Sequence, residues 1–408
     1  MAVERLISGL GRLQRTWQDR KRFRGIQREI ENRLSHSSIG LHLTNASCFA
    51  APGGLERYVL ESARFAAEEL KCSSLIVFPD PTKDNRVNLL ADLQPVEGLE
   101  LSDFERLLTL LSGSIRSAHI QHSMNWNLDR LKAVLNFAEK NVSRRVVYLH
   151  DYHFICRQHN LLWNDQQFCG PPESIENGLC ASCVYGPLVR PYRTTWADRF
   201  QSIELFVAPS ETAARIFVQA YPMFSGRVRV IPHLVVSEAG SAAVEPSQDE
   251  KISIVFSGAT GFNKGIDRFS KLIAKYGARY QWVTVGIEDY YRDNPLVRHV
   301  PYNFHEQTGL SEILQQLKPA VAFLGSVVPE TFSYTTHEML AAGMPIVTTV
   351  ESGNIAAVVD RLSAGRVYGS LNELEQAFED GDSIRAIVRS AKRFRVELNR
   401  AGLREIYR

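Results

Sequence analysis

The chain has 408 residues, 44% hydrophobic and 23% charged, as is typical of a soluble globular protein with room for two domains. Its net charge of +2, from 47 basic and 45 acidic side chains, lacks the basic excess of a dedicated nucleic-acid binder. There is no apolar run of the roughly 18 residues that a membrane span needs and no secretory signal, so we expect a cytoplasmic protein.

The two ends of the chain are basic. Residues 1–36 carry nine Lys or Arg side chains against four acids, and residues 385–408, predicted to be a helix, carry eight against two. Four apolar residues share one face of the helix predicted in the first segment: Leu6, Leu10, Leu13 and Trp17. This pattern is typical of an amphipathic helix on an anionic membrane surface, and equally of a helix packed on its own protein or on a partner.

Runs rich in Val, Ile and Phe, each followed by a helical pattern, recur in two blocks. The first block holds IGLHLT, SSLIVF, AHIQHS, RRVVYLH, LFVAPS and RVRVIP, and the second holds ISIVFSG, YQWVTVG, AVAFLG and MPIVTTV. Such alternation predicts two α/β domains with parallel sheets, residues 37–236 and 252–384, joined by a polar linker over 237–251. Ligands bind beyond the carboxyl ends of parallel strands, so we expect a cleft between the domains.

A glycine pair, Gly53 and Gly54, separates the first predicted strand from a helical pattern over 55–70. The N–H groups exposed at such a helix start favour a phosphate group. A tight turn is the alternative interpretation.

Four of the six cysteines lie within 28 residues of a predicted insertion over 153–195: Cys156, Cys169, Cys180 and Cys183. Cytosolic thiols stay reduced, and four thiolates could close a structural zinc site, with His153 and His159 as substitute ligands. Because the first two cysteines lack the close spacing of a zinc knuckle, buried thiols without metal are the alternative.

The second block opens on the loop SGATGFNKG, between a predicted strand and a helix. Gly258 and Gly261 make this loop compact, and Lys264 can reach a diphosphate with a point charge. A surface lysine without a ligand is the alternative.

Glu330 and Glu338 lie in PETFSYTTHEML, after the strand AVAFLG. If the helix begins near Thr331, eight residues at about 100° each place the two glutamates within roughly 80° around its axis. Both could then face one cleft, and two solvated charges on an ordinary helix are the alternative.

Together these motifs resemble the retaining GT-B glycosyltransferases of family 4, which transfer sugars from nucleotide donors. The resemblance covers about residues 39–385. Its motifs, in order, are PGGLER, the pair His150 and Asp151, VAPSE, RVRVIP, G-x5-K-G ending at Lys264 and Gly265, and E-x7-E before AAGMPIV. It implies an α/β GT-B fold, in which two Rossmann-like domains face each other across a cleft, with a C-terminal helix that crosses back to the first domain.

The resemblance also implies roles for the donor-binding residues. Glu330 would bind hydroxyls of the donor sugar near the reacting carbon, and Glu338 would bind the ribose hydroxyls. The backbone N–H groups of Phe332 and Ser333 would contact the sugar and the diphosphate, alongside the glycine loops.

For catalysis, Lys264 would neutralise the leaving diphosphate and His150 would orient the donor sugar. No metal or other cofactor is implied for the reaction. Because the diphosphate itself is expected to take the acceptor proton, we name no nucleophile.

Two positions depart from the family pattern. Ala259 stands where an arginine usually follows the first glycine of the lysine motif, and Ala356 stands where an acid is usual. Either another cation such as Arg268 or Arg57 compensates, or donor binding is weakened or lost.

The resemblance thus implies a hexosyltransferase of retaining type that acts on a polysaccharide or glycolipid acceptor in cell-surface glycan synthesis. The basic ends of the chain would favour a location peripheral to an anionic membrane. His119 and His122, at a strand end, are either acceptor-pocket residues or structural. The alternatives are a catalytically silent GT-B module that binds or scaffolds partners, and a GT-B enzyme that hydrolyses or epimerises a nucleotide sugar.

Overall fold

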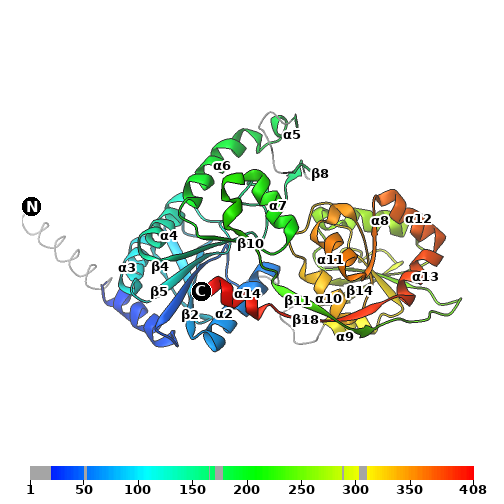
Figure 1. Cartoon of the computed structure of the whole chain (residues 1–408), viewed down its shortest axis with the longest axis horizontal. Coiled ribbons are helices and arrows are strands. Elements are labelled where there is room, and N and C mark those ends of the chain that lie inside the picture. The colour runs from blue at the N-terminus through cyan, green and yellow to red at the C-terminus, as the bar shows by residue number, and fades with distance from the viewer. Residues whose placement is uncertain (1–19, 50–52, 165, 171–177, 287–288, 303–309) are drawn as a thin grey trace, which may run out of the picture.

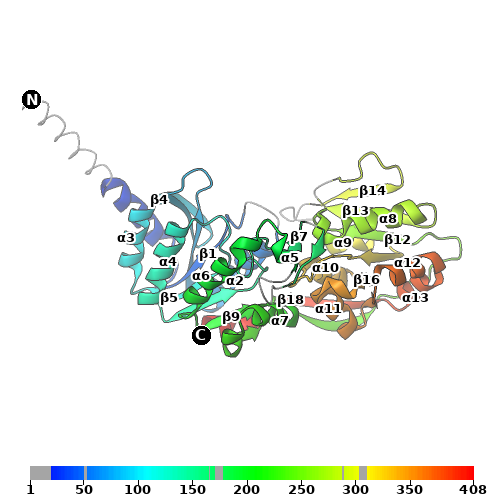
Figure 2. The same ribbon diagram turned by 90° about the horizontal axis from the view of Figure 1, so that it is seen from above.

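A computed structural model describes residues 20–49, 53–164, 166–170, 178–286, 289–302 and 310–408. Two α/β domains lie side by side, each with its own sheet (Figures 1 and 2). None of the helices within these ranges is long and apolar enough to cross a bilayer.

The basic N-terminal segment is described only in part, and the face of Leu6, Leu10, Leu13 and Trp17 lies outside the described residues. Residues 20–33 are helical. Phe23, Ile26 and Ile30 of this helix are buried in the core of the first domain. This part of the segment therefore packs on its own protein.

The first sheet has eight strands. Their order is β10 (Val228–Val230), β9 (Leu205–Ala208), β6 (Arg144–Tyr148), β5 (Ile115–Ile120), β1 (Ser38–Leu43), β2 (Cys72–Pro79), β3 (Arg86–Ala91) and β4 (Gln94–Glu100). The six strands expected from the sequence run parallel. The hairpin β3–β4 was missed, and it extends the sheet antiparallel at one edge.

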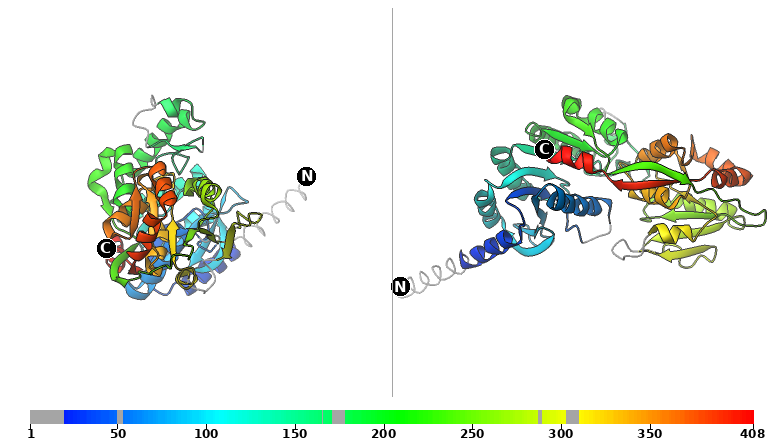
Figure 3. Two further views of the ribbon diagram at one scale, coloured as in Figure 1. Left: turned by 90° about the vertical axis from the view of Figure 1, so that its right-hand side faces the viewer. Right: turned by 60° about the horizontal axis from the view of Figure 1, so that its bottom comes forward.

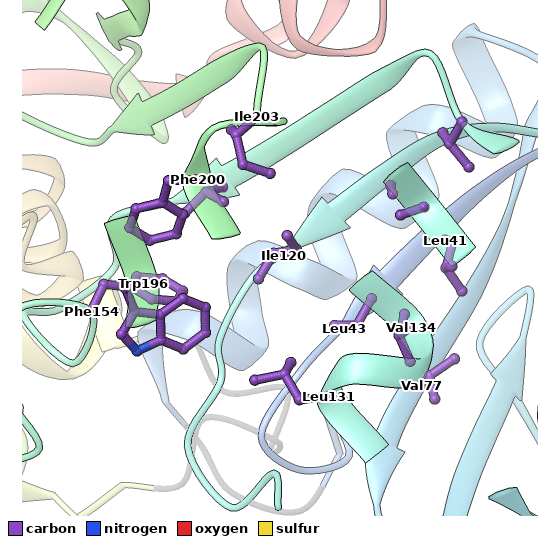
Figure 4. Packing of buried hydrophobic residues seen from close by; sticks show 14 of the residues in the cluster. Leu41, Leu43, Val77, Ile120, Leu131, Val134, Phe154, Trp196, Phe200 and Ile203 are labelled. Atoms are coloured by element: carbon purple, nitrogen blue, oxygen red, sulfur yellow. The ribbon is translucent and has the colours of Figure 1, made fainter. Parts of the chain in front are cut away.

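Helices cover both faces of this sheet: α2 (Gly54–Glu69), α3 (Leu101–Leu111), α4 (Leu128–Asn141), α6 (Gly186–Phe200) and α7 (Glu211–Ala220). The largest core cluster joins Leu41, Leu43 and Val77 of the strands to Val134 of α4 (Figure 4). The same cluster continues through Trp196 of α6, so the end of the predicted insertion is packed into the domain core.

Within the predicted insertion, a short hairpin and two helices form. They are β7 (Leu162–Trp163), β8 (Gln167–Phe168), α5 (Gly178–Ala181) and the first part of α6. The segment η1 (Pro222–Arg227) leads from α7 to β10.

The second sheet is parallel, with the order β14 (Val297–Pro301), β13 (Gln281–Gly286), β12 (Ser253–Ser257), β15 (Ala320–Phe323), β16 (Ile346–Thr349) and β17 (Gly365–Tyr368). The edge strands β14 and β17 were missed, because they are short and partly exposed. The helices of this domain are α8 (Ile266–Tyr276), α9 (Leu310–Gln315), α10 (Tyr334–Ala342), α11 (Asn354–Leu362), α12 (Leu371–Asp380) and α13 (Asp382–Arg389).

The expectations for the linker and the last segment need correction. β11 (Leu234–Ser241) occupies the start of the predicted linker, and it pairs antiparallel with β18 (Lys392–Leu398) in the segment predicted as a helix. β18 alternates charged residues with Phe394, Val396 and Leu398, and Phe394 and Val396 pack with Val236 of β11 on the core of the second domain. The two strands lie far apart in the chain and pair with each other along their length. Beyond β18, α14 (Arg400–Tyr407) packs on the first domain (Figure 3, right).

Candidate functional site

A cavity of about 630 Å³ lies between the two domains. All nine residues predicted to act in catalysis or donor binding line it: Gly53, Gly54, His150, Gly258, Lys264, Glu330, Phe332, Ser333 and Glu338. The first three come from strand ends and helix starts of the first domain, and the other six come from the second domain. The fold therefore brings the motifs together, as their positions after parallel strands led us to expect.

The start of α10 differs from the prediction. The helix begins at Tyr334 rather than near Thr331, because Ser333 adopts a left-handed backbone (φ 67°) and its hydroxyl caps the N–H of Thr336. Glu338 is therefore about one turn into the helix, while Glu330 lies in the preceding loop. The angle predicted from a continuous helix does not apply, although both carboxylates line the cavity.

Glu330 and Lys264 form an ion pair inside the cavity. Nζ of Lys264 lies 2.7 Å from Oε1 of Glu330, whose side chain is 12% exposed. The hydroxyl of Ser326 also contacts this oxygen, at 3.3 Å. The backbone N–H of Glu330 donates to the carbonyl of Ser352, which fixes the loop. The two residues predicted to act on the sugar and on the diphosphate are thus in direct contact.

The second glutamate pairs with a cation from the other domain. Nη1 of Arg57, in the first turns of α2, lies 2.9 Å from Oε1 of Glu338. The guanidinium also lies over the ring of Tyr334, 4.7 Å from its centroid. Burial raises the pKa of Glu338, and Arg57 offsets part of that rise. The pair links the domains across the cavity wall.

Of the two cations considered as substitutes for an arginine at position 259, only Arg57 lines this cavity, as Ala259 does. Arg268 lines a different cavity of about 730 Å³, beside the hairpin β7–β8. There it pairs with Glu351 and hydrogen-bonds the hydroxyl of Thr349. The structure therefore leaves Arg57 as the candidate.

The lysine loop depends on a glycine. Gly265 follows the short helix η2 (Phe262–Lys264) with φ 87°, a conformation that favours glycine. A Cβ at this position would also overlap the carbonyl oxygen of Gly325. The sharp turn between Lys264 and α8 holds the lysine at the cavity wall.

The N-termini of α2 and α10 meet at the cavity wall. A Cβ on Gly54 would lie 2.9 Å from the ring of Tyr334, the first residue of α10. The carboxylate of Glu56 lies over Gly53 and bonds its own backbone N–H, at the place where the sequence predicts a phosphate. Burial raises the pKa of Glu56. A phosphate could bind at this helix end only if Glu56 moved.

His122 and Asp151 form a second polar pair on the first-domain wall. Nε2 of His122 lies 2.6 Å from Oδ2 of Asp151, and the backbone N–H of Met124 donates to Nδ1 of His122. The imidazole is therefore held with its proton on Nε2. Burial opposes ionisation of Asp151, but His122 and the N–H of His153 outweigh it and lower its pKa to about 2. His119 is fully buried and bonds Ser117 and Tyr148, so it is structural.

Sequence reasoning missed His233, which follows β10 at the domain junction and lines the cavity. It is 4% exposed, and its ring packs against Tyr58 at 4.1 Å and Phe332 at 4.5 Å. Neither ring nitrogen has a hydrogen-bond partner among the described residues. Its position directly after RVRVIP was the signal, because polar residues beyond parallel strands face the ligand site.

The four cysteines of the insertion lie close enough to influence one another. Burial raises the pKa of Cys156, Cys169 and Cys180, and the neighbouring thiols add to each rise. Four thiols suit zinc chemically, but in the described ranges no three metal-binding side chains are arranged to hold an ion. Nδ1 of His153 faces the hydroxyls of Ser123 and Tyr192, at 3.0 and 3.3 Å.

Comparison with solved structures defines the fold as GT-B. HepE from Anabaena in complex with UDP is 12% identical, with a TM-score of 0.54 over 91% of this chain and 95% of that one. The pneumococcal O-GlcNAc transferase GtfA, in complex with UDP and GlcNAc, is 11% identical, with a TM-score of 0.54 over 91% and 96%. A glycosyltransferase from Rickettsia africae is 12% identical, with a TM-score of 0.53 over 90% and 93%. No family model and no curated protein matches the sequence.

Proposed function

We propose that the protein is a retaining glycosyltransferase that moves a sugar from a nucleotide-diphosphate donor to a hydroxyl of a glycan or glycolipid. The carrying observation is that one interdomain cavity is lined by two helix N-termini and by the pairs Lys264–Glu330 and Arg57–Glu338. The N-terminus of α2 becomes available to a phosphate when Glu56 moves. Cations and helix ends suit a diphosphate, and carboxylates suit sugar hydroxyls. Binding of UDP by HepE and GtfA supports a nucleotide donor.

In this reaction the acceptor oxygen bonds the anomeric carbon as the bond from that carbon to the diphosphate breaks. The acceptor proton passes to the departing diphosphate. Lys264 stabilises the charge that develops on the diphosphate, and Glu330 holds sugar hydroxyls beside the reacting carbon. Donor binding therefore exchanges the Lys264–Glu330 contact for contacts of each residue with the donor.

Arg57 takes the place of the arginine that Ala259 lacks. When the ribose hydroxyls bind Glu338, the guanidinium of Arg57 turns from the carboxylate to a phosphate oxygen. A charge-assisted contact is worth roughly 1.5–3 kcal/mol, enough to offset one missing cation. Asp151 and His122 then form the acceptor side of the cavity.

The proposal predicts three losses. We expect Lys264→Ala and Glu330→Ala to lower kcat by about 10²–10³-fold, because each removes a contact made at the transition state. Arg57→Ala should weaken donor binding by roughly tenfold or more, since about 1.4 kcal/mol corresponds to a factor of ten. A thermal-shift and turnover screen across nucleotide sugars measures both effects.

Arg268→Ala is the matched control for this screen, because Arg268 lines the other cavity. It should keep its donor binding and turnover. If no nucleotide sugar stabilises the wild type, the enzyme proposal fails. Equal turnover in the wild type, Lys264→Ala and Glu330→Ala would defeat the site assignment.

A catalytically silent GT-B module is the second candidate. It is favoured by Ala259 and by the two ion pairs, in which the cavity cations already neutralise the cavity carboxylates. This module would bind partners without turnover. Release of the free sugar or its epimer in the absence of an acceptor would instead indicate a nucleotide-sugar hydrolase or epimerase.

We also propose that residues 1–19 attach the protein to the inner face of an anionic membrane, where it acts in cell-surface glycan synthesis. Because residues 20–33 pack into the first domain, only the first 19 residues should be deleted in the test. Binding to phosphatidylserine vesicles should fall in the deletion variant, and unchanged binding would remove the membrane proposal.

For the cysteine cluster we propose a structural zinc ion, bound after the four thiols draw together. Elemental analysis of the purified protein should find about one zinc per chain, and Cys183→Ser should lose it. A folded, metal-free wild type would exclude zinc.

A further inference from the structure

Gln121, a fully buried residue just beyond β5, joins His150 to the interior of the first domain. Its side-chain oxygen lies 2.8 Å from Nε2 of His150, and its side-chain nitrogen lies 3.3 Å from Nδ1 of His42 on β1. Nε2 of His42 lies 3.1 Å from the hydroxyl of Tyr407 on α14. A hydrogen-bonded chain, here called the relay and made of His150, Gln121, His42 and Tyr407, therefore runs from the cavity to the C-terminal helix.

Both imidazoles in the relay are neutral near pH 7. Burial lowers the pKa of His150 and of His42 to about 3. A neutral imidazole has one N–H donor and one acceptor nitrogen, so each ring can be in only one of two tautomers. The hydrogen-bond partners of each ring determine which tautomer it adopts.

The direction of the relay follows from the orientation of the Gln121 amide. Its oxygen faces His150 and its NH₂ faces Nδ1 of His42, so the NH₂ donates and Nδ1 of His42 accepts. The single proton of His42 then lies on Nε2 and is donated to the hydroxyl oxygen of Tyr407.

The carbonyl oxygen of Gln121, which faces His150, can only accept. The single proton of His150 must lie on Nε2, and Nδ1 is left with a lone pair. Among the described residues, Nδ1 of His150 has no hydrogen-bond partner. Unlike the ring nitrogens of His233, it is not fully buried, so a ligand can reach it. The ring stacks on Tyr148, with centroids 5.5 Å apart and 4° between the planes, and meets the edge of Tyr58 at 5.3 Å. Its orientation is therefore fixed.

We infer that Gln121 is a positioning residue: through the relay with His42 and Tyr407 it holds His150 as the Nε2–H tautomer and presents Nδ1 to a hydroxyl of the donor sugar. A bare nitrogen acceptor suits a hydroxyl hydrogen and repels a phosphate oxygen, so His150 distinguishes the sugar from the diphosphate. This inference rests on the proposed glycosyltransferase function. It also makes α14 part of the support of the site.

Nitrogen NMR of the protein labelled with ¹⁵N-histidine tests the tautomer without any substrate. The ring signals of His150 are assigned by their loss in His150→Asn. We expect a protonated Nε2 and an unprotonated Nδ1 in the wild type. A wild-type ring protonated on Nδ1 would overturn the inference.

Three variants test the positioning role. Gln121→Leu removes both bonds of the amide, so both tautomers of His150 should appear and kcat should fall about 10- to 100-fold while the donor KM changes less. Gln121→Glu keeps an acceptor for Nε2–H, so this tautomer should persist. Tyr407→Phe, which removes one hydroxyl only, should give a smaller loss of kcat and serves if Gln121→Leu does not fold.

Gln201→Leu is the matched control, because it makes the same substitution at an exposed position. It should leave the His150 signals and kcat unchanged. Wild-type tautomer and kcat in both Gln121→Leu and Tyr407→Phe would overturn the inference. A wild type without turnover on any donor would defeat the proposed function, while the NMR result would still decide the relay.

Discussion

The charged residues of the sequence motifs form ion pairs in the cavity, and these pairs could not be predicted from the motifs alone. Glu330 contacts Lys264 at 2.7 Å and Glu338 contacts Arg57 at 2.9 Å, so no motif residue of E-x7-E faces the cavity as an isolated charge. Such pairs reduce the cost of holding charges in a site from which water is partly excluded. In the proposed reaction, donor binding would replace these two ion pairs with contacts between the same side chains and the donor.

The lowered pKa of Asp151 predicts how the stability of the fold depends on pH. Its pKa is lowered from 3.8 to about 2, so the native state favours the ionised form. The stabilisation is fully present above the unfolded pKa near 4 and is lost as the pH falls through about 2. Lowering the pKa of Asp151 from 3.8 to about 2 corresponds to about 2 kcal/mol of folding free energy.

We therefore expect Asp151→Asn to lower the free energy of unfolding by about 2 kcal/mol at pH 7. The difference from the wild type should shrink between pH 4 and pH 2. Urea unfolding at several pH values measures it, with Asp249→Asn in the exposed linker as the control. A difference that stays constant down to pH 2 would contradict the assignment.

At the scale of elements, short turns before helices place the functional side chains. α10 begins after a left-handed Ser333, and α8 begins after a left-handed Gly265. In both cases a loop follows the strand, and the left-handed residue ends this loop at the helix start, so residues of the loop line the cavity. Glycine is required at position 265 because a side chain there would meet the backbone of Gly325.

Gly265→Ala should accordingly destabilise the second domain by about 1–3 kcal/mol, from backbone strain alone, with further loss from the overlap. It should also weaken donor binding, because Lys264 would be displaced. Gly113→Ala is the control, since a Cβ there meets nothing within 4 Å and the change should stay within about 0.5 kcal/mol. Equal melting temperatures for the two variants would contradict this account of the turn.

At the scale of the whole molecule, the chain crosses between the domains twice. β11 leads from the first domain into the second, β18 runs back beside it, and α14 ends on the first domain. Leu403 and Ile406 of α14 are buried against Tyr58 and its neighbours. The C-terminal helix therefore belongs to the core of the first domain, and it connects the relay to the strand pair between the domains.

Ile406→Ala should lower the stability of the first domain by about 2–5 kcal/mol, because the side chain is fully buried. Calorimetry should show the transition of the first domain moving down while that of the second changes little. Leu110→Ala is the control in the same domain, at a position that is 53% exposed. If only the second transition moved, the assignment of α14 to the first core would be wrong.

The sequence by itself determined the α/β class, the presence of two parallel sheets and the location of nine predicted residues beside one cavity. These features are local: apolar runs mark parallel strands, and residues just after such strands gather at one edge of each sheet. The nine predicted residues line one cavity for this reason. The GT-B arrangement was expected from the motif order and agrees with the comparisons.

Only the tertiary structure decided the rest, because it depends on partners far apart in the chain. β11 and β18 pair with each other although the whole of the second domain separates them in the chain. The Arg57–Glu338 pair, the ring contacts of His233 and the hydrogen bonds of Gln121 all join residues that no sequence spacing relates. Spacing along a chain predicts which side of an element a residue occupies, whereas its hydrogen-bond partner is fixed only when separate elements pack.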